Sequence, residues 1–314
     1  MSAVLESQAG LRTEAGTALR TLAGTVRARP AQPAPGLLVD RPLPAPEIQQ
    51  VSPFLMIDHF GPKAIPAGSS GGLNPHPHRG FATVTLLLEG AMEHRDSAGN
   101  RGVIRKDGVQ WMTAASGVLH AEYLEAEFAR TGGTQHGIQL WVNLPAKDKM
   151  VAPGYQDLPA ESHAVVSRDG ATLRLVAGEA LGARGPARSH TPMMVARVTL
   201  APGASIELPA PREWNALAYV VESGTADGEG VEVADGEAWR ALARRHMAVW
   251  NRDGGTVRLR TGAVEAELLV LAGEPIEEPV VSWGPFVMNT REEIQQAQRD
   301  YSSGKMGRPE GVPF

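Results

Sequence analysis

Two short pairs of polar residues constrain this chain more than any other feature of its sequence. His76 and His78 are two residues apart, and His120 and Glu122 repeat that spacing further along. In a β-strand, residues i and i+2 point to the same face, so each pair can present two ligand atoms to one space. Two facing strands would bring all four side chains together. Three imidazoles and a carboxylate suit a divalent transition metal, most naturally iron, with manganese, nickel, copper or zinc as alternatives.

The segments around these pairs predict an all-β fold. The chain has 314 residues, of which 35 are glycine and 24 are proline, and such turn chemistry favours many short elements. Apolar segments of strand length lie at 37–41, 52–60, 83–90, twice within 108–123, and at 136–145. Gly99-Asn100 marks a turn within 95–102. Because helices of 10–15 residues do not alternate with these segments, we expect a sandwich or barrel rather than a doubly wound sheet.

The second half of the chain shows a weak repeat of the first. The segment PAPREWNALAYVVESG (209–224) aligns without a gap on PHPHRGFATVTLLLEG (75–90). Ala210 and Arg212 then occupy the positions of His76 and His78. The alignment predicts two copies of one β-barrel unit, of which the second lacks the histidine pair.

The two ends of the chain give different signals. Residues 1–35 carry only an interrupted apolar stripe, and the proline-rich stretch 29–36 is typical of an extended linker, because each proline disfavours the α conformation of its predecessor. We therefore expect a poorly defined, partly disordered tail. At the other end, Thr290 and Glu293 form a capping-box pattern that predicts a helix. We expect its packing stripe at Ile294, Ala297 and Tyr301, and its C-terminal end at Gly304.

Composition excludes several classes of function. The net charge of −5 gives no general attraction to nucleic acid or to anionic membranes. The absence of cysteine excludes a disulfide framework, a thiolate metal site and a cysteine nucleophile. The N-terminus carries no apolar run of signal-peptide length, and no stretch reaches the roughly 18 apolar residues of a membrane span. We expect a cytoplasmic protein.

The remaining histidines are interpreted as structural. His94 lies at the edge of a turn, where a solvated side chain is expected, and His59 is expected to hydrogen-bond Asp58 and fix its loop. His136 and His246 are expected to lie at the surface or in packing contacts. The glycine-rich run 68–72 lacks the Lys-Ser/Thr ending of a phosphate-binding loop, and Ser116 lies in no nucleophile elbow. The alternative for the two pairs is a histidine-stabilised turn and a buried His–Glu contact. It leaves the convergence of three histidines and a carboxylate without a structural purpose.

These segments, in this order and spacing, resemble the pirin family of the cupin superfamily. The resemblance rests on PHPHRGF, TVTLLLEG, EHRDSAGNRG, VQWMTA, GVLHAEY, HGIQLWVNLP and, later, LAGEPIEEPVVSWGPFVMNTREEIQQA, and it covers roughly residues 36–305. It implies two cupin barrels, at 36–150 with metal and at 151–288 without metal ligands, followed by a helix and tail at 289–314. It also implies one iron per chain, held by the residues that match His76, His78, His120 and Glu122. Ala82 stands where the family commonly has a glutamate, which is expected to alter the surroundings of the metal.

The resemblance implies two rival functions. Some bacterial pirins resemble quercetin 2,3-dioxygenases, which open the heterocycle of a flavonol with O2 and release carbon monoxide. In that case the partners are O2 and a small aromatic substrate, and Glu122 is a ligand and a general base. Other pirins are described as iron-binding regulators of a transcription factor or metabolic enzyme, so that a protein partner is expected, with no direct nucleic-acid or membrane binding. A purely structural metal site is less consistent, because closed structural zinc sites favour cysteine.

Overall fold

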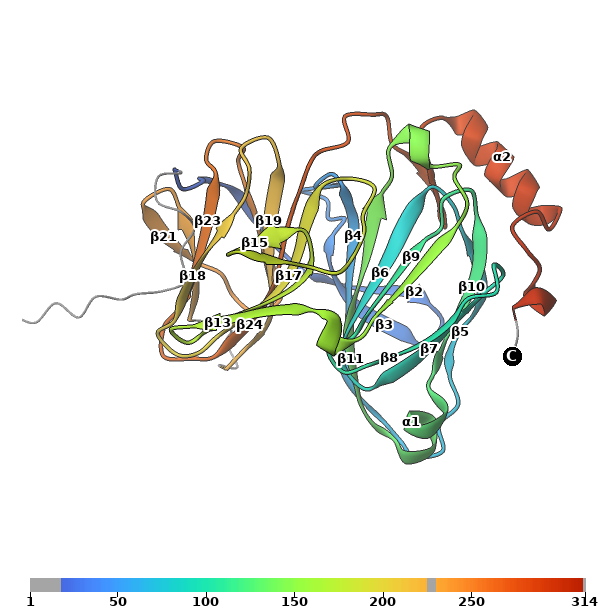
Figure 1. Ribbon diagram of the computed structural model, residues 1–314, viewed down its shortest axis with the longest axis horizontal. Coiled ribbons are helices and arrows are strands. Elements are labelled where there is room, and N and C mark those ends of the chain that lie inside the picture. Colours follow the sequence, from blue (N-terminus) through green and yellow to red (C-terminus); the bar gives the residue numbers. More distant parts are fainter. Residues whose placement is uncertain (1–17, 225–229, 313–314) are drawn as a thin grey trace, which may run out of the picture. The chain divides into compact units, whose positions relative to one another are not determined.

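The computed structural model describes residues 18–224 and 230–312, and β-strands make up most of them (Figure 1). Within these limits the chain forms two compact units. One contains residues 28–163, 186–192 and 274–312, and we call it the first barrel. The other contains residues 18–27, 164–185 and 193–273 except 225–229, and we call it the second barrel. Residues 1–17 of the predicted tail lie outside the described part of the chain.

The first barrel consists of two antiparallel sheets. The seven-stranded sheet has the order β12 (Gly154–Leu158), β9 (Val109–Thr113), β6 (Phe81–Glu89), β11 (Gly133–Asn143), β4 (Phe54–Ile65), β3 (Leu37–Leu43), β2 (Arg29–Ala34). The four-stranded sheet has the order β5 (Gly72–His78), β10 (Val118–Leu124), β7 (Ala91–Asp96), β8 (Arg101–Arg105). Each of the apolar segments that were predicted above to be strands contains a strand in the structure.

The second barrel repeats this plan. Its seven-stranded sheet has the order β1 (Leu22–Arg27), β22 (His246–Trp250), β19 (Asn215–Ser223), β24 (Ala266–Gly273), β17 (Met193–Leu200), β14 (Ala171–Ala177), β13 (Ala164–Arg168). Its four-stranded sheet has the order β18 (Ser205–Pro209), β23 (Thr256–Thr261), β20 (Val231–Asp235), β21 (Ala238–Ala241). The strand β19 begins and ends where the predicted alignment of 209–224 on 75–90 places the counterpart of β6. The two predicted antiparallel barrels are therefore confirmed.

Part of the expected N-terminal tail is ordered sheet. The strand β1 pairs with β22, and β2 pairs with β3 across the stretch that the sequence predicted as a linker. Both are edge strands, and Pro30 and Pro33 fit in β2 because an edge strand tolerates residues that cannot donate to a ladder. The compact units consequently divide at 27/28 and not at the expected residue 36, and residues 274–288 lie in the first barrel rather than in the second.

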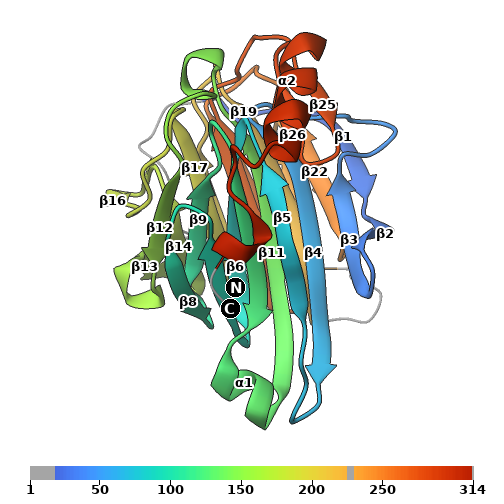
Figure 2. The same cartoon turned by 90° about the vertical axis from the view of Figure 1, so that its right-hand side faces the viewer.

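The C-terminal helix packs on the first barrel. The helix α2 (Arg291–Ser302) begins with the predicted capping box, in which the Glu293 N–H donates to Thr290 Oγ1. Ile294 and Ala297 are buried with residues of β10 and of β26 (Phe286–Met288), and Figure 2 shows α2 beside that strand. Tyr301 was expected in the same stripe but stays 40% exposed. Asp300 is buried in its place.

The remaining elements are short. The strand β26 pairs with β25 (Val281–Trp283), β15 (Glu179–Ala180) pairs with β16 (Ala183–Arg184), and a helix α1 (Ala126–Thr131) precedes β11. Single 3-10 turns lie at Ala146–Asp148, Ala160–Ser162 and Pro309–Gly311. Across residues 18–224 and 230–312, no helix has the length and apolar character needed to cross a bilayer.

Candidate metal centre

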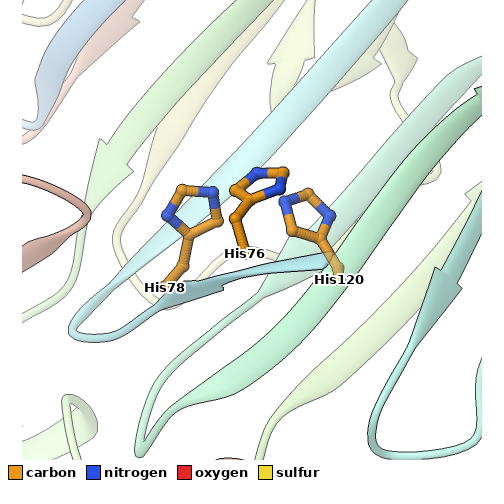
Figure 3. A group of neighbouring side chains, drawn as sticks. All are labelled: His76, His78 and His120. Carbon is orange, nitrogen blue, oxygen red and sulfur yellow. The ribbon is translucent and has the colours of Figure 1, made fainter. Parts of the chain in front are cut away.

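Three histidines converge inside the first barrel. The antiparallel pairing of β5 and β10 places His76 opposite His120 and His78 opposite Val118. One ring nitrogen from each of His76, His78 and His120 lies within 4.8 Å of the other two. Figure 3 shows the three rings turned toward one another, two from β5 and one from β10. The i, i+2 spacing and the facing of the two strands thus gather three of the four predicted side chains.

The Nδ1 atoms of these rings are already occupied. His76 Nδ1 lies 2.8 Å from the carbonyl of Asn74, and His78 Nδ1 lies 3.4 Å from the carbonyl of Pro285. His120 Nδ1 lies 3.4 Å from Nδ1 of His94. In each ring Nε2 is therefore the nitrogen that remains available to coordinate a metal ion. His120 Nε2 is buried without a hydrogen-bond partner among the described residues, an arrangement that a bound cation would satisfy.

Burial keeps two of the rings neutral. Desolvation lowers the pKa of His78 well below its ordinary value, and the neighbouring His76 lowers it further. Desolvation likewise lowers the pKa of His120, with additional contributions from His76, His78 and His94. Neutral imidazole is the form that binds a metal ion. The chemistry of the donor set and its protonation therefore fit a divalent transition metal.

Glu122 lies beside the three histidines but outside their close group. It follows His120 on β10, and an irregularity in the pairing with β5 places it opposite Leu73. Its side chain is buried, and Oε1 accepts a hydrogen bond from the Thr85 hydroxyl at 3.3 Å. The group of ligand atoms that lie within 4.8 Å of one another at this site contains His76, His78 and His120 but not Glu122. The role of Glu122 as a fourth ligand stays a prediction.

The site faces a large cavity in the first barrel. The cavity has a volume of about 960 Å³, and His76, His78 and Glu122 lie in its wall. Much of the remaining wall is apolar, with Met56, Phe60, Trp141 and Val287 among its residues. This volume is within the range typical of small-molecule sites. A metal bound by the histidines would therefore be accessible to an organic ligand of moderate size.

Arg41 and Asp58 form an ion pair in the cavity wall. Arg41 donates to both carboxylate oxygens of Asp58, each at 2.6 Å. The expected hydrogen bond from His59 to Asp58 is therefore replaced by this ion pair, and His59 Nε2 lies 2.6 Å from Nε2 of the buried His136. Burial raises the pKa of Asp58, although the bonds from Arg41 act in the opposite direction. Arg41 and Asp58 therefore add no unpaired charge to the cavity wall.

One expectation about the surroundings of the site is wrong, and the expected effect of Ala82 on the metal stays a prediction. His94 is 1% exposed rather than solvated, because β7 lies between β10 and β8 and turns this side chain inward. Ala82 does not face Glu122. The regular pairing of β6 with β9 and the contact of Thr85 with Glu122 place Ala82 on the opposite face of β6, because residues separated by three positions point to opposite faces.

Asp96 and Tyr155 are further neighbours that the sequence analysis missed. His94 Nε2 lies 3.2 Å from a carboxylate oxygen of Asp96, and the rings of His94 and Tyr155 stack with centroids 4.7 Å apart. The spacing of His94 and Asp96 was a usable signal, since it is the same i, i+2 spacing as in the two ligand pairs. Tyr155 gave no such signal, because β12 joins the site only through tertiary pairing with β9.

Comparison with known proteins agrees with this architecture. Residues 36–142 match the sequence model of the pirin domain, and residues 195–307 match that of the pirin C-terminal cupin domain. A pirin-like protein of Solanum lycopersicum is 39% identical, with 92% of this chain and 93% of that protein aligned. Pirin of Homo sapiens is 38% identical over 87% of this chain and 89% of its own length.

A solved structure gives the same result for the fold. The crystal structure of quercetin 2,3-dioxygenase from Acinetobacter baumannii superposes with a TM-score of 0.84 at 35% identity. The superposition covers 93% of this chain and all of the other chain. The two barrels, the histidine site and the matches to both pirin domains lead to one conclusion: the chain belongs to the pirin family and has its two-cupin architecture.

Proposed function

We propose that this protein is a metal-dependent dioxygenase that opens the heterocycle of quercetin or a related flavonol with O2 and releases carbon monoxide. The observation that carries the proposal is the position of the histidine site. Three available imidazole nitrogens lie close together, and two of the three histidines, His76 and His78, lie in the wall of a largely apolar cavity of about 960 Å³, which suits a flat aromatic ligand. The 35% identity with a quercetin 2,3-dioxygenase of known structure supports the same reaction.

The metal would be held by Nε2 of His76, His78 and His120, with the Glu122 carboxylate as the fourth donor. Iron is the metal we propose for this donor set, and manganese, nickel, copper and zinc have overlapping preferences. When bound, the metal supplies a Lewis acid and a template for O2 and the substrate oxygen. The site belongs to a single barrel, so we expect one metal per chain.

The chain's own residues bind the substrate and move its proton. Trp141 and Phe60 offer aromatic surface to a flavonol ring in the cavity. Glu122 accepts the proton of the flavonol hydroxyl as a general base, and the hydroxyl of Thr85 fixes the orientation of the carboxylate. The apolar wall excludes water from the reacting ring system.

The test is turnover by metal-loaded protein. Quercetin loss, O2 uptake and carbon monoxide release should exceed those caused by the free metal. Glu122→Gln keeps the shape of the side chain but removes the base, so the rate should fall by roughly 10²–10⁴-fold. Glu93→Gln is a matched control on β7, since Glu93 forms ion pairs with Arg95 and Arg101 instead. Absence of turnover above the free-metal rate would exclude the dioxygenase.

A second candidate is a regulatory iron-binding protein, and one set of contacts favours it. The strand that carries His78 continues into Arg79, whose guanidinium forms a buried ion pair with Asp300 of α2 at 2.9 Å. His78 itself approaches the carbonyl of Pro285. A change at the metal can therefore reach the C-terminal helix. Capture of cellular partners by iron-loaded and metal-free protein tests this function, and a partner set that is independent of iron would contradict it.

A further inference from the structure

His120 is the first member of a chain of buried polar groups that leads away from the metal site. Its Nδ1 lies 3.4 Å from Nδ1 of His94, and His94 Nε2 lies 3.2 Å from Oδ2 of Asp96. All three side chains are buried. The two histidines come from the neighbouring strands β10 and β7, and Asp96 is the last residue of β7.

Asp96 is itself fixed by the turn between β7 and β8. Its Oδ1 accepts the backbone N–H groups of Ala98 and Asn100, at 3.0 and 2.9 Å. Its Oδ2 accepts the Asn100 amide at 2.8 Å in addition to His94. Burial alone would raise the pKa of Asp96, but the hydrogen bonds from His94 and Asn100 lower it. The group at the end of the chain is therefore a rigid carboxylate.

An ionised carboxylate can only accept hydrogen bonds, which fixes the direction of the whole chain. The Nε2 of His94 must carry the proton that Asp96 accepts. In a neutral imidazole the other nitrogen is then an acceptor, so His94 Nδ1 accepts from His120 Nδ1–H. With its proton on Nδ1, His120 keeps the Nε2 lone pair that faces His76 and His78.

The ring of His94 is also held by packing. Tyr155 stacks on it with an interplanar angle of 19°. Gly102 lies opposite His94 on β8, and a Cβ at that position would lie 2.0 Å from the Tyr155 hydroxyl oxygen. The glycine thus makes room for Tyr155 to lie flat against the imidazole.

We propose that Asp96 and His94 are positioning residues of the metal site, which fix the tautomer of His120 that presents Nε2 to the metal. The inference rests on the proposed metal centre but not on the proposed reaction. It holds equally if the bound metal regulates a partner. Outer partners of this kind typically change metal affinity by about 10–100-fold when they are removed.

Asp96→Asn tests the direction of the chain without changing its volume. The amide oxygen must serve the two backbone N–H groups, so the amide NH2 faces His94. His94 then accepts at Nε2 and donates at Nδ1, which leaves the proton of His120 on Nε2. Competition of zinc alone against a chromogenic chelator should show about 10–100-fold weaker binding. Zinc affinity within twofold of the wild type would overturn the proposal.

Nitrogen-15 chemical shifts of the histidine rings report the tautomers directly in the metal-free protein. We expect His120 to carry its proton on Nδ1 in the wild type and on Nε2 in Asp96→Asn. A purely structural role of Asp96 would leave the tautomers unchanged. An Nε2–H tautomer of His120 in the wild type would overturn the proposal, whereas loss of quercetin turnover alone would concern only the reaction.

Two further variants complete the test. His94→Phe keeps a ring against Tyr155 but removes the acceptor for His120, so zinc binding should again weaken at least tenfold; unchanged binding would contradict the proposal. This variant leaves Asp96 and its turn in place, so it decides the question even if Asp96→Asn does not fold. Glu93→Gln is the matched control, since Glu93 is also a buried carboxylate of β7 but accepts from Arg95 and Arg101. Its zinc affinity should stay within twofold, and an equal loss in this control would overturn the specific role of Asp96.

Discussion

The corresponding strand pairs of the two barrels carry different side chains. In the first barrel, β5 and β10 place His76 opposite His120. In the second, the alignment puts Ala210 at the position of His76, and its N–H donates to the carbonyl of Gly255 at 2.8 Å. Along β18 and β23, Ile206 faces Leu259 and Leu208 faces Val257, all of them in the apolar core. One barrel framework thus either leaves imidazole nitrogens facing a cavity or fills the space with aliphatic side chains.

The second barrel buries a cation of its own at this place. The Arg20 guanidinium is fully buried and donates Nε–H to the carbonyl of Gly254 at 3.1 Å. Its Nη2 donates to the carbonyls of Ala210 and Pro211, at 3.0 and 2.5 Å. Desolvation lowers the pKa of Arg20. Where the first barrel presents ring nitrogens to an added cation, the second presents backbone carbonyls to a side chain that is part of the chain.

Loss of Arg20 should give the largest effect on folding. Arg20→Met removes charge-assisted bonds to three carbonyls and leaves these groups buried, so the free energy of unfolding should fall by about 3 kcal/mol. Arg212→Met is the control, because Arg212 is exposed and donates to the carbonyl of Asp253 at the surface. Urea unfolding measures both. Equal stability of the two variants would show that Arg20 is not the structural counterpart of the metal.

The first barrel uses a buried arginine differently, next to the ligand strand. Arg79 pairs with Asp300, and Lys305 and Gln296 also donate to that carboxylate. Burial alone would raise the pKa of Asp300, but the bonds from Lys305, Arg79 and Gln296 lower it to about 2. Asp300→Asn should lower the free energy of unfolding at neutral pH by about 1.5–3 kcal/mol.

The pH dependence of unfolding sharpens this prediction. The pKa of Asp300 is lower in the folded state than the roughly 3.9 of an unfolded aspartate, so its contribution is complete above about pH 4. It is lost as the pH falls through the folded-state value of about 2. Asp300→Asn should therefore lose less stability than the wild type between pH 4 and pH 2. Parallel stability curves over this window would contradict the role given to Asp300.

The smallest effect is expected at the tyrosine that packs on His94. Gly102→Ala forces the Tyr155 hydroxyl away from a Cβ that would lie 2.0 Å from it, and such overpacking costs about 1–3 kcal/mol. Gly154→Ala is the matched control on β12, where the nearest atom to an added Cβ is 4.0 Å away. Thermal unfolding compares the two. Destabilisation by Gly154→Ala of the same size would show a general cost of alanine in these strands.

The sequence predicted the strands and the convergence of His76, His78 and His120 for one physical reason. Strand parity and turn residues are local signals, and the ligand pairs lie on single strands where parity applies. The capping box of α2 is local in the same way. By contrast, the burial of His94 depends on β7 lying between two other strands, which no neighbouring residue encodes.

The N-terminal segment shows the same limit more strongly. The strand β1 pairs with β22, more than two hundred residues later, and Arg20 finds its acceptors at Ala210, Pro211 and Gly254. Prolines and interrupted apolar positions gave no periodic signal for either. Strand parity also gave no information on the orientation of Ala82, because β5 ends at His78 and β6 begins at Phe81, so parity does not continue across the turn.

The central claim is that the first barrel binds one metal through the histidines of β5 and β10 while the second binds none. The most direct test is elemental analysis of the purified protein beside the double variant His76→Ala, His120→Ala. We predict about one equivalent of metal per chain in the wild type and essentially none in the variant, with the second barrel still folded. Stoichiometric metal in the double variant would contradict this assignment of the site.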